Sequence, residues 1–202
     1  MEDELVAAVD DEKVVASNAA VASGKCRQIA NGAVYSEDGS YTRLHTAKYD
    51  ALADLLEELQ GEPCLVTYEF KFDEEWLVNE MKIPSASTGN AKKDNAVIAK
   101  FSSGDMIAMC GNPASISLGT DGLQNSCFNI AMLGVTWKAQ DYEQVIDRVR
   151  RSGNKSKKVI VHRLIAAGTL DERAIRVVDG RMGDQKDFMK ALKEMRDERR
   201  RK

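Results

Sequence analysis

The chain has 202 residues, a formal net charge of −3, 43% hydrophobic residues and 30% charged residues. This length and apolar content suffice for one globular domain with a sizeable core and an extension at either end, whereas two full domains would be cramped. No apolar run approaches the 18 residues of a membrane span, and the acidic amino terminus lacks the order of a signal peptide. We therefore expect a soluble, cytoplasmic protein with no membrane partner.

Charge is distributed unevenly along the chain. Residues 1–13 contain six acidic residues and one lysine, whereas residues 138–163 contain eight lysines and arginines and three acidic residues. A contact with a polyanion is therefore expected in the second segment. The four cysteines are scattered, without C-x2-C spacing or a nearby histidine pair, so neither a disulfide framework nor a zinc site is indicated.

The amino-terminal third predicts a helical or irregular extension and one amphipathic helix. Residues up to about 29 are rich in alanine and have helical propensity, although their apolar stripe is weak. Two short strands are predicted at 33–35 and 41–44, between turns that contain glycine. Residues 47–59 predict a helix with one apolar face, formed by Leu52, Leu55, Leu56 and Leu59.

Strands and helices then alternate to the end of the chain. Strands are predicted at 64–70, 106–110, 129–135 and 158–164. Helices are predicted at 74–81, 94–101 and 144–151, and from residue 170 onward. This order indicates crossover connections, and therefore an α/β fold with a mostly parallel sheet.

Three polar side chains in the penultimate helix have the spacing of a phosphate site. Gln144, Arg148 and Arg151 are related as i, i+4 and i+7, so on a helix they project from one face and can converge on one ligand. A guanidinium donates several fixed hydrogen bonds to phosphoryl oxygens as charge develops on them. The alternative is a solvated helix face in which Asp147 and Arg151 form an i,i+4 pair worth roughly 0.3 kcal/mol, and this would be favoured for the motif in isolation.

A polar loop at residues 112–124 lies between two predicted strands, where the carboxyl edge of an open α/β sheet binds ligands. Its glycines allow backbone amides to approach a phosphate, and Ser115, Ser117 and Thr120 can donate hydroxyl groups to a nucleic-acid backbone. The alternative is a turn and helix cap without a ligand, which these residues alone favour.

Four segments, taken together and in order, resemble a known family. Residues 25–32, 65–73, 112–124 and 144–154, with Trp137 upstream of the last, resemble the carboxyl-terminal RecA-like lobe of Swi/Snf-type ATP-dependent DNA translocases in helicase superfamily two, most closely the compact bacteriophage versions. The resemblance covers residues 20–178. It implies a RecA-like three-layer lobe at 41–178, a helical or irregular extension at 1–40, a basic helical tail at 179–202, and a location in the host cytoplasm if a phage encodes it.

The resemblance also implies roles for individual residues. Arg148 and Arg151 resemble arginine fingers that reach the γ-phosphate of ATP held by another lobe, and Gln144 resembles a residue that orients them. Gly122, with its neighbour Asp121, resembles the loop that links nucleotide and DNA contacts. The resemblance further implies DNA-phosphate contacts for three residues, Ser115, Lys71 and Thr120. Two positions depart from the family pattern: Gln124-Asn125 replaces Asn-Leu, and Asn154 replaces Gln.

The sequence contains neither a G-x4-GK-[ST] phosphate loop nor an acidic pair that ends a strand and holds Mg²⁺. Asp73 follows an apolar run, but its expected role is to open a helix. ATP and Mg²⁺ are therefore expected to be held mainly by a partner lobe that contains a phosphate loop. The hypothesis is a split DNA helicase or translocase whose second lobe hydrolyses almost no ATP alone.

Two alternatives remain open. The first is a RecA-like nucleic-acid-binding or docking module without catalysis, which the basic segments at 155–158 and 199–202 suit. The second is a nucleotide-binding enzyme of unrelated chemistry. The second of these is disfavoured because no Cys/His dyad or metal cluster supports it.

Overall fold

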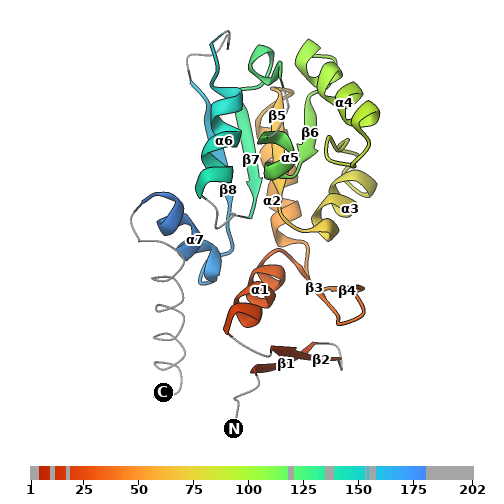
Figure 1. Cartoon of the computed structure of the whole chain (residues 1–202), viewed down its shortest axis with the longest axis vertical. Coiled ribbons are helices and arrows are strands. Elements are labelled where there is room, and N and C mark those ends of the chain that lie inside the picture. Colours follow the sequence, from red (N-terminus) through yellow and green to blue (C-terminus); the bar gives the residue numbers. More distant parts are fainter. Residues whose placement is uncertain are drawn as a thin grey trace. The chain divides into compact units, whose positions relative to one another are not determined.

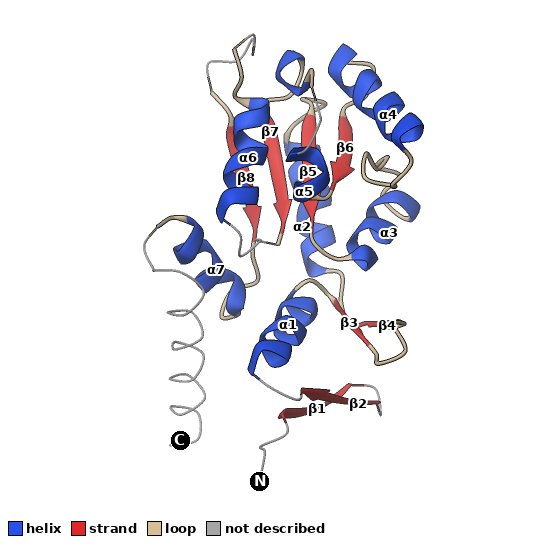
Figure 2. Ribbon diagram, in the orientation of Figure 1, coloured by secondary structure: helices blue, strands red, loops and turns tan. Residues whose placement is uncertain are grey.

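The computed structural model describes residues 5–9, 12–16, 19–117, 121–134, 139–152, 154 and 158–180. The chain divides into two compact units, which we call the sheet unit (residues 46–165) and the terminal unit (residues 1–45 with 166–202). Figures 1 and 2 show the elements of both. None of the described helices combines the length and the hydropathy that crossing a membrane requires.

The sheet unit is built on four parallel strands in the order β6-β5-β7-β8. The strands are β5 (Cys64–Tyr68), β6 (Ala108–Gly111), β7 (Asn129–Leu133) and β8 (Ile160–Leu164). Every residue of the two central strands, β5 and β7, is buried. Such continuous burial is characteristic of a parallel sheet covered on both faces. The predicted mostly parallel sheet is confirmed.

Helices cover both faces of this sheet (Figure 2). They are α2 (Ala47–Glu58), α3 (Lys71–Asn79), α4 (Ala91–Ser103), α5 (Pro113–Ser117) and α6 (Ala139–Val149), with a 3₁₀ turn η1 (Leu123–Asn125). The predicted leucine face of α2 is confirmed, because Leu52 lies in the core with Val66 and Ala131, and Leu55, Leu56 and Leu59 pack against that core. Helix, sheet and helix form the three layers of a RecA-like α/β lobe.

The described residues of the terminal unit form two small antiparallel hairpins and two helices. The hairpins are β1 (Leu5–Val9) with β2 (Glu12–Ala16), and β3 (Ala33–Tyr35) with β4 (Tyr41–Arg43); the helices are α1 (Ala19–Ala30) and α7 (Leu170–Val178). The second hairpin and α1 agree with prediction, but residues 5–9 and 12–16 form strands where a helical or irregular extension was expected. Val6, Val9, Val14 and Val15 are β-branched, which favours extended backbone over helix. The expected tail at 179–202 lies almost wholly outside the described residues.

Asp73 opens α3, as predicted, and is completely buried. Its carboxylate accepts a hydrogen bond from the Phe70 backbone N–H at 3.0 Å, at the helix N-cap, and another from the Tyr49 hydroxyl at 2.8 Å. Helix α3 therefore begins at Lys71, three residues earlier than expected, because Asp73 acts from within its first turn.

We expect Asp73→Ala to lower the free energy of unfolding by about 3 kcal/mol, because two donors lose their charged acceptor. Tyr49→Phe removes one of these donors and should cost about 1 kcal/mol. Urea denaturation of both variants measures the difference. An unchanged midpoint for Asp73→Ala would indicate a surface carboxylate available for other chemistry.

Three of the four cysteines, Cys64, Cys110 and Cys127, are buried, and only Cys26 is exposed. Burial raises the pKa of each of the three to about 12, so almost no thiolate forms at neutral pH. These side chains pack as small hydrophobic groups, as expected.

We expect one thiol, that of Cys26, to react rapidly with an aromatic disulfide reagent at about pH 8, and three more to react only after unfolding. Cys26→Ser should abolish the rapid phase. A second rapidly reacting thiol in the folded protein would contradict the burial of the other three.

Candidate functional site

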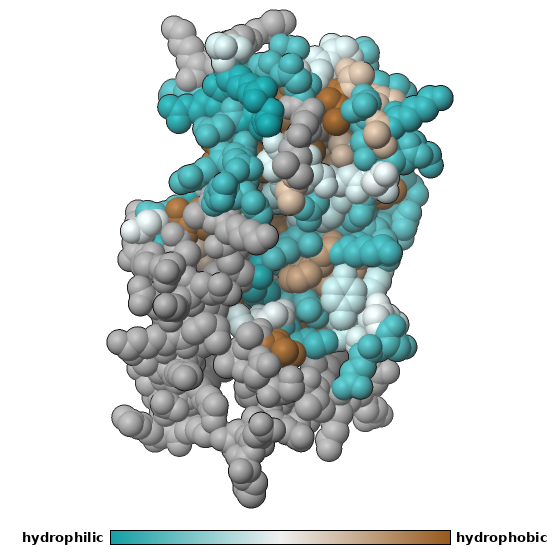
Figure 3. Space-filling model, viewed as in Figure 1, coloured by the Kyte–Doolittle hydropathy of each residue, from teal (hydrophilic) through white to brown (hydrophobic). Residues whose placement is uncertain are grey.

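Helix α6 is the element that carries the predicted arginines. Tyr142, Val145 and Val149 are buried, whereas Glu143 and Asp147 are exposed, so the helix is strongly amphipathic. On the face shown in Figure 3, the surface over α6 is hydrophilic. This pattern fixes the rotation of the helix and places its half-buried positions, including residues 144 and 148, beside the buried stripe.

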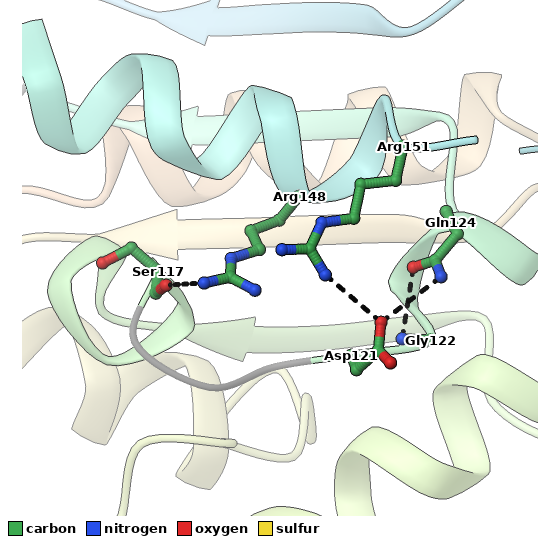
Figure 4. Close-up of polar contacts among 6 residues, drawn as sticks. All are labelled: Ser117, Asp121, Gly122, Gln124, Arg148 and Arg151. Atoms are coloured by element: carbon green, nitrogen blue, oxygen red, sulfur yellow. Dashed lines mark hydrogen bonds and ion pairs between the residues drawn. The ribbon is translucent and has the colours of Figure 1, made fainter.

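Arg148 lies in the last turn of α6, and its Nη2 donates a hydrogen bond to the Ser117 carbonyl oxygen at 2.6 Å. Arg151 lies two residues beyond the end of the helix at Val149, so the prediction of a continuous helix through Arg151 is wrong. Its Nη1 is 3.3 Å from Asp121 Oδ1. Both side chains nevertheless project toward the same segment of chain, as Figure 4 shows.

The segment that Arg151 contacts is a tight polar turn before β7. Gln124 donates from Nε2 to Asp121 Oδ1 at 3.4 Å, and its Oε1 accepts from the Gly122 backbone N–H at 3.2 Å. Gly122 has a φ of 93°, a left-handed conformation that favours glycine. Hydrogen bonds from Gln124 and the Gly122 backbone lower the pKa of Asp121, with a smaller contribution from Arg151. Its carboxylate therefore stays ionised at neutral pH.

Asn154 fixes the chain after α6. Its Nδ2 donates to the carbonyl oxygens of Val149 at 2.7 Å and Cys127 at 3.1 Å. The contact joins the end of α6 to the residues that enter β7. Gln124 and Asn154 are two of the residues at which the sequence departs from the pattern of the family that it resembles. That departure was the only signal in the sequence for their local roles.

The arginines therefore lie at the amino edge of the sheet, where β7 begins. The expectation that residues 112–124 lie together at the carboxyl edge is only partly right. Asn112 directly follows β6 and lies at that edge, but α5 then carries the chain along the sheet, and Asp121 approaches the start of β7.

A hollow of about 240 Å³ opens at the carboxyl edge. It is lined by the ends of β5 and β7 and the starts of α5 and α6: Thr67, Tyr68, Glu69, Asn112, Pro113, Ala114, Met132, Gly134, Asp141, Tyr142 and Val145. The lining contains two carboxylates and no lysine or arginine, which disfavours a phosphate inside it. Arg163 holds Tyr142 in place, with its Nε donating to the tyrosine hydroxyl at 2.8 Å.

The predicted nucleic-acid residues that the structure describes are both exposed. Lys71 begins α3 directly after β5, and Ser115 lies in α5 directly after β6, so both belong to the carboxyl edge. The structure does not bring them to the arginines. Thr120 and Trp137 lie outside the described residues.

Gln144 is half-buried on α6, and it makes no hydrogen bond to either arginine within the described part of the chain. The same residues contain no group of three or more His, Cys, Asp or Glu side chains placed to hold a metal ion. The site thus presents guanidinium groups suited to phosphate oxygens, without a described set of ligands for Mg²⁺.

We compared the chain with known proteins by sequence and by structure. No protein-family model matches the chain. The chain is similar to the p41 protein of Acyrthosiphon pisum secondary endosymbiont phage 1, with 29% identity over 198 residues that cover 96% of this chain and 42% of p41. This chain therefore spans about two fifths of the length of that relative.

Two solved structures are also similar. The C-terminal part of the Fun30 ATPase domain matches with a TM-score of 0.54 and 19% identity over 65% of this chain and 44% of that chain. The Pyrococcus furiosus Hef helicase domain matches with a TM-score of 0.47 and 20% identity over 69% and 28%. The likeness to the Fun30 structure supports the fold alone, which is a RecA-like α/β lobe.

We expect Gly122→Ala to destabilise the protein by roughly 1–2 kcal/mol, because the left-handed backbone is strained and the new Cβ would lie 3.1 Å from Ser102 Oγ. Gly89→Ala is the matched control, since Gly89 also has a positive φ but has no atom within 4 Å of the added Cβ. Thermal denaturation of both variants checks the prediction. Equal losses would show that the Ser102 contact does not constrain the turn.

Proposed function

We propose that this chain is the second lobe of a split ATP-dependent DNA helicase or translocase of the Swi/Snf type, and that it completes an ATPase site when it docks on a lobe containing a phosphate loop. The observation that supports this most is the pair of guanidinium groups from one helix end that project to the same side (Figure 4). Within the described residues each guanidinium makes one contact, through one terminal nitrogen, so several of its N–H donors are available to a ligand.

The residues present suit contact with a triphosphate that the partner lobe holds. Arg148 is anchored to a neutral carbonyl oxygen, so its charge is uncompensated there, and Arg151 lies on the exposed side of the same turn. Arg148 and Arg151 would bind the phosphoryl oxygens of ATP, with Gly122 and Gln144 supporting them and Asp121 beside Arg151. When bound, ATP with Mg²⁺ supplies the phosphoryl group whose transfer drives movement along DNA.

DNA would be bound at the other edge of the lobe. Lys71 and Ser115 are exposed there and offer a cation and a hydroxyl group to backbone phosphates. Thr120, the third contact proposed from the sequence, lies outside the described residues. The two carboxylates that line the hollow, Glu69 and Asp141, disfavour a DNA path through it. Such contacts grip the backbone without reading bases, as stepping along DNA requires.

The experiment is to express the chain alone and together with products of neighbouring reading frames that contain a phosphate loop, and to assay ATP hydrolysis with and without DNA. We expect negligible turnover for the chain alone and DNA-stimulated turnover for the pair. In the pair, Arg151→Ala should lower turnover by about 10³-fold, because the transition state loses a charged donor.

Arg150→Ala is the matched control, because Arg150 is exposed and adjacent, and its loss changes the net charge equally. It should stay within about twofold of the unaltered pair. An unchanged rate for Arg151→Ala would exclude the arginine-finger role. Salt-sensitive DNA binding by the chain alone, with no ATPase from any pair, would instead favour a non-catalytic nucleic-acid-binding module.

A further inference from the structure

Arg148 and Arg151 have partners of different charge. Arg148 donates to a backbone carbonyl oxygen, whereas Arg151 contacts the carboxylate of Asp121. A carboxylate and a phosphoryl group offer a guanidinium the same kind of charged oxygen acceptor. Among the described residues, Arg151 contacts an anion supplied by the chain itself, whereas Arg148 contacts only a neutral oxygen.

The carboxylate of Asp121 is held in position by groups other than Arg151. Gln124 donates to the same oxygen, Oδ1, and is itself held by the Gly122 backbone N–H. The hydrogen bond from Gln124, together with a backbone hydrogen bond from Gly122 to the carboxylate, lowers the pKa of Asp121 more than Arg151 does. The turn therefore presents an ionised carboxylate to Arg151 whether or not the arginine stays there, as the arrangement in Figure 4 illustrates.

The contact between the two side chains is weak enough to be exchanged. The side chains of Arg151 and Asp121 are 42% and 80% exposed, and one nitrogen meets one oxygen at 3.3 Å. Exposed ion pairs of this kind are screened by solvent and salt and contribute little to stability. A polyphosphate that offers several charged oxygens to both arginines competes successfully with a single, poorly desolvated carboxylate.

We propose that Asp121 is an internal anion that occupies Arg151 until a phosphoryl group displaces it. This inference rests on the proposed function, since it takes Arg148 and Arg151 as the phosphate contacts. Asp121 then lowers the affinity of the free chain for phosphate compounds, and release of Arg151 is a step in the assembly of the ATPase site. Asp121 is thus a regulatory residue and not a nucleotide ligand.

Inorganic tripolyphosphate is the probe, and isothermal titration calorimetry with the full chain at low ionic strength is the measurement. Asp121→Asn removes the negative charge, nearly preserves shape, and should tighten binding roughly two- to fivefold. Because Asp121 is exposed, the variant should fold normally, which thermal denaturation checks. Asp54→Asn is the matched control, since Asp54 is exposed on α2 and the substitution changes net charge equally; it should leave affinity unchanged.

The double variant Asp121→Asn with Arg151→Ala separates the two claims. The double variant should lose the tighter binding of Asp121→Asn and bind tripolyphosphate more weakly than the unaltered chain does. Equal affinity of Asp121→Asn and the unaltered chain, with weaker binding by Arg151→Ala, would overturn the internal-anion proposal and leave the arginine-finger role intact. Binding unaffected by Arg151→Ala in either background would overturn both, as would the absence of tripolyphosphate binding by every variant.

Discussion

The packing of α6 against the parallel sheet determines where both arginines lie. Tyr142, Val145 and Val149 are buried against strands that run antiparallel to the helix, so α6 returns the chain from the carboxyl edge to the amino edge. The rest of its surface is charged, and a short helix of this composition is marginal in water without such packing. This buried face, together with the packing of α6 beside α5 and η1, sets how Arg148 and Arg151 approach the turn before β7.

The two arginines are not equivalent, although they belong to one motif. Arg148 is half-buried within the helix and anchored to the Ser117 carbonyl oxygen, and no carboxylate contact is found for it in the described part of the chain. Arg151 lies beyond the helix end, more exposed and beside a carboxylate. In the proposed reaction Arg148 is a fixed contact, and Arg151 is the side chain that changes partner. The difference arises because the helix ends at Val149, so Arg148 keeps helical backbone geometry and Arg151 does not.

The two edges of the sheet offer different chemistry. At the amino edge, guanidinium groups lie over a turn whose amides and glycine are held in place by Gln124. At the carboxyl edge, Lys71 and Ser115 lie exposed near a hollow that contains the carboxylates of Glu69 and Asp141. In the proposed machine nucleotide and DNA are therefore contacted at separate edges, and α5, with the residues around it, is the stretch of chain common to both.

Much of this architecture could be predicted from residue patterns, because the apolar face of a helix and the apolar run of a buried strand are set by the order of neighbouring residues. The strand runs, the leucine face of α2, the role of Asp73 and the arginine pair all have local signals. The valine-rich residues 5–16 were misjudged because alanine propensity competes with β-branching in short segments. The end of α6 and the roles of Gln124 and Asn154 could not be predicted, since each depends on a partner distant in sequence or on a backbone turn.

By itself, the sequence determined the fold class, the presence of two closely spaced guanidinium groups and the lack of a phosphate loop in this chain, since these are properties of composition, spacing and periodicity. Only the tertiary structure decided at which edge of the sheet the arginines lie, and that Arg151 meets Asp121 while Arg148 meets a carbonyl oxygen. The physical reason is that a side chain's partner is set by how helices pack across the sheet, which joins residues 30 positions apart whose proximity no local pattern records.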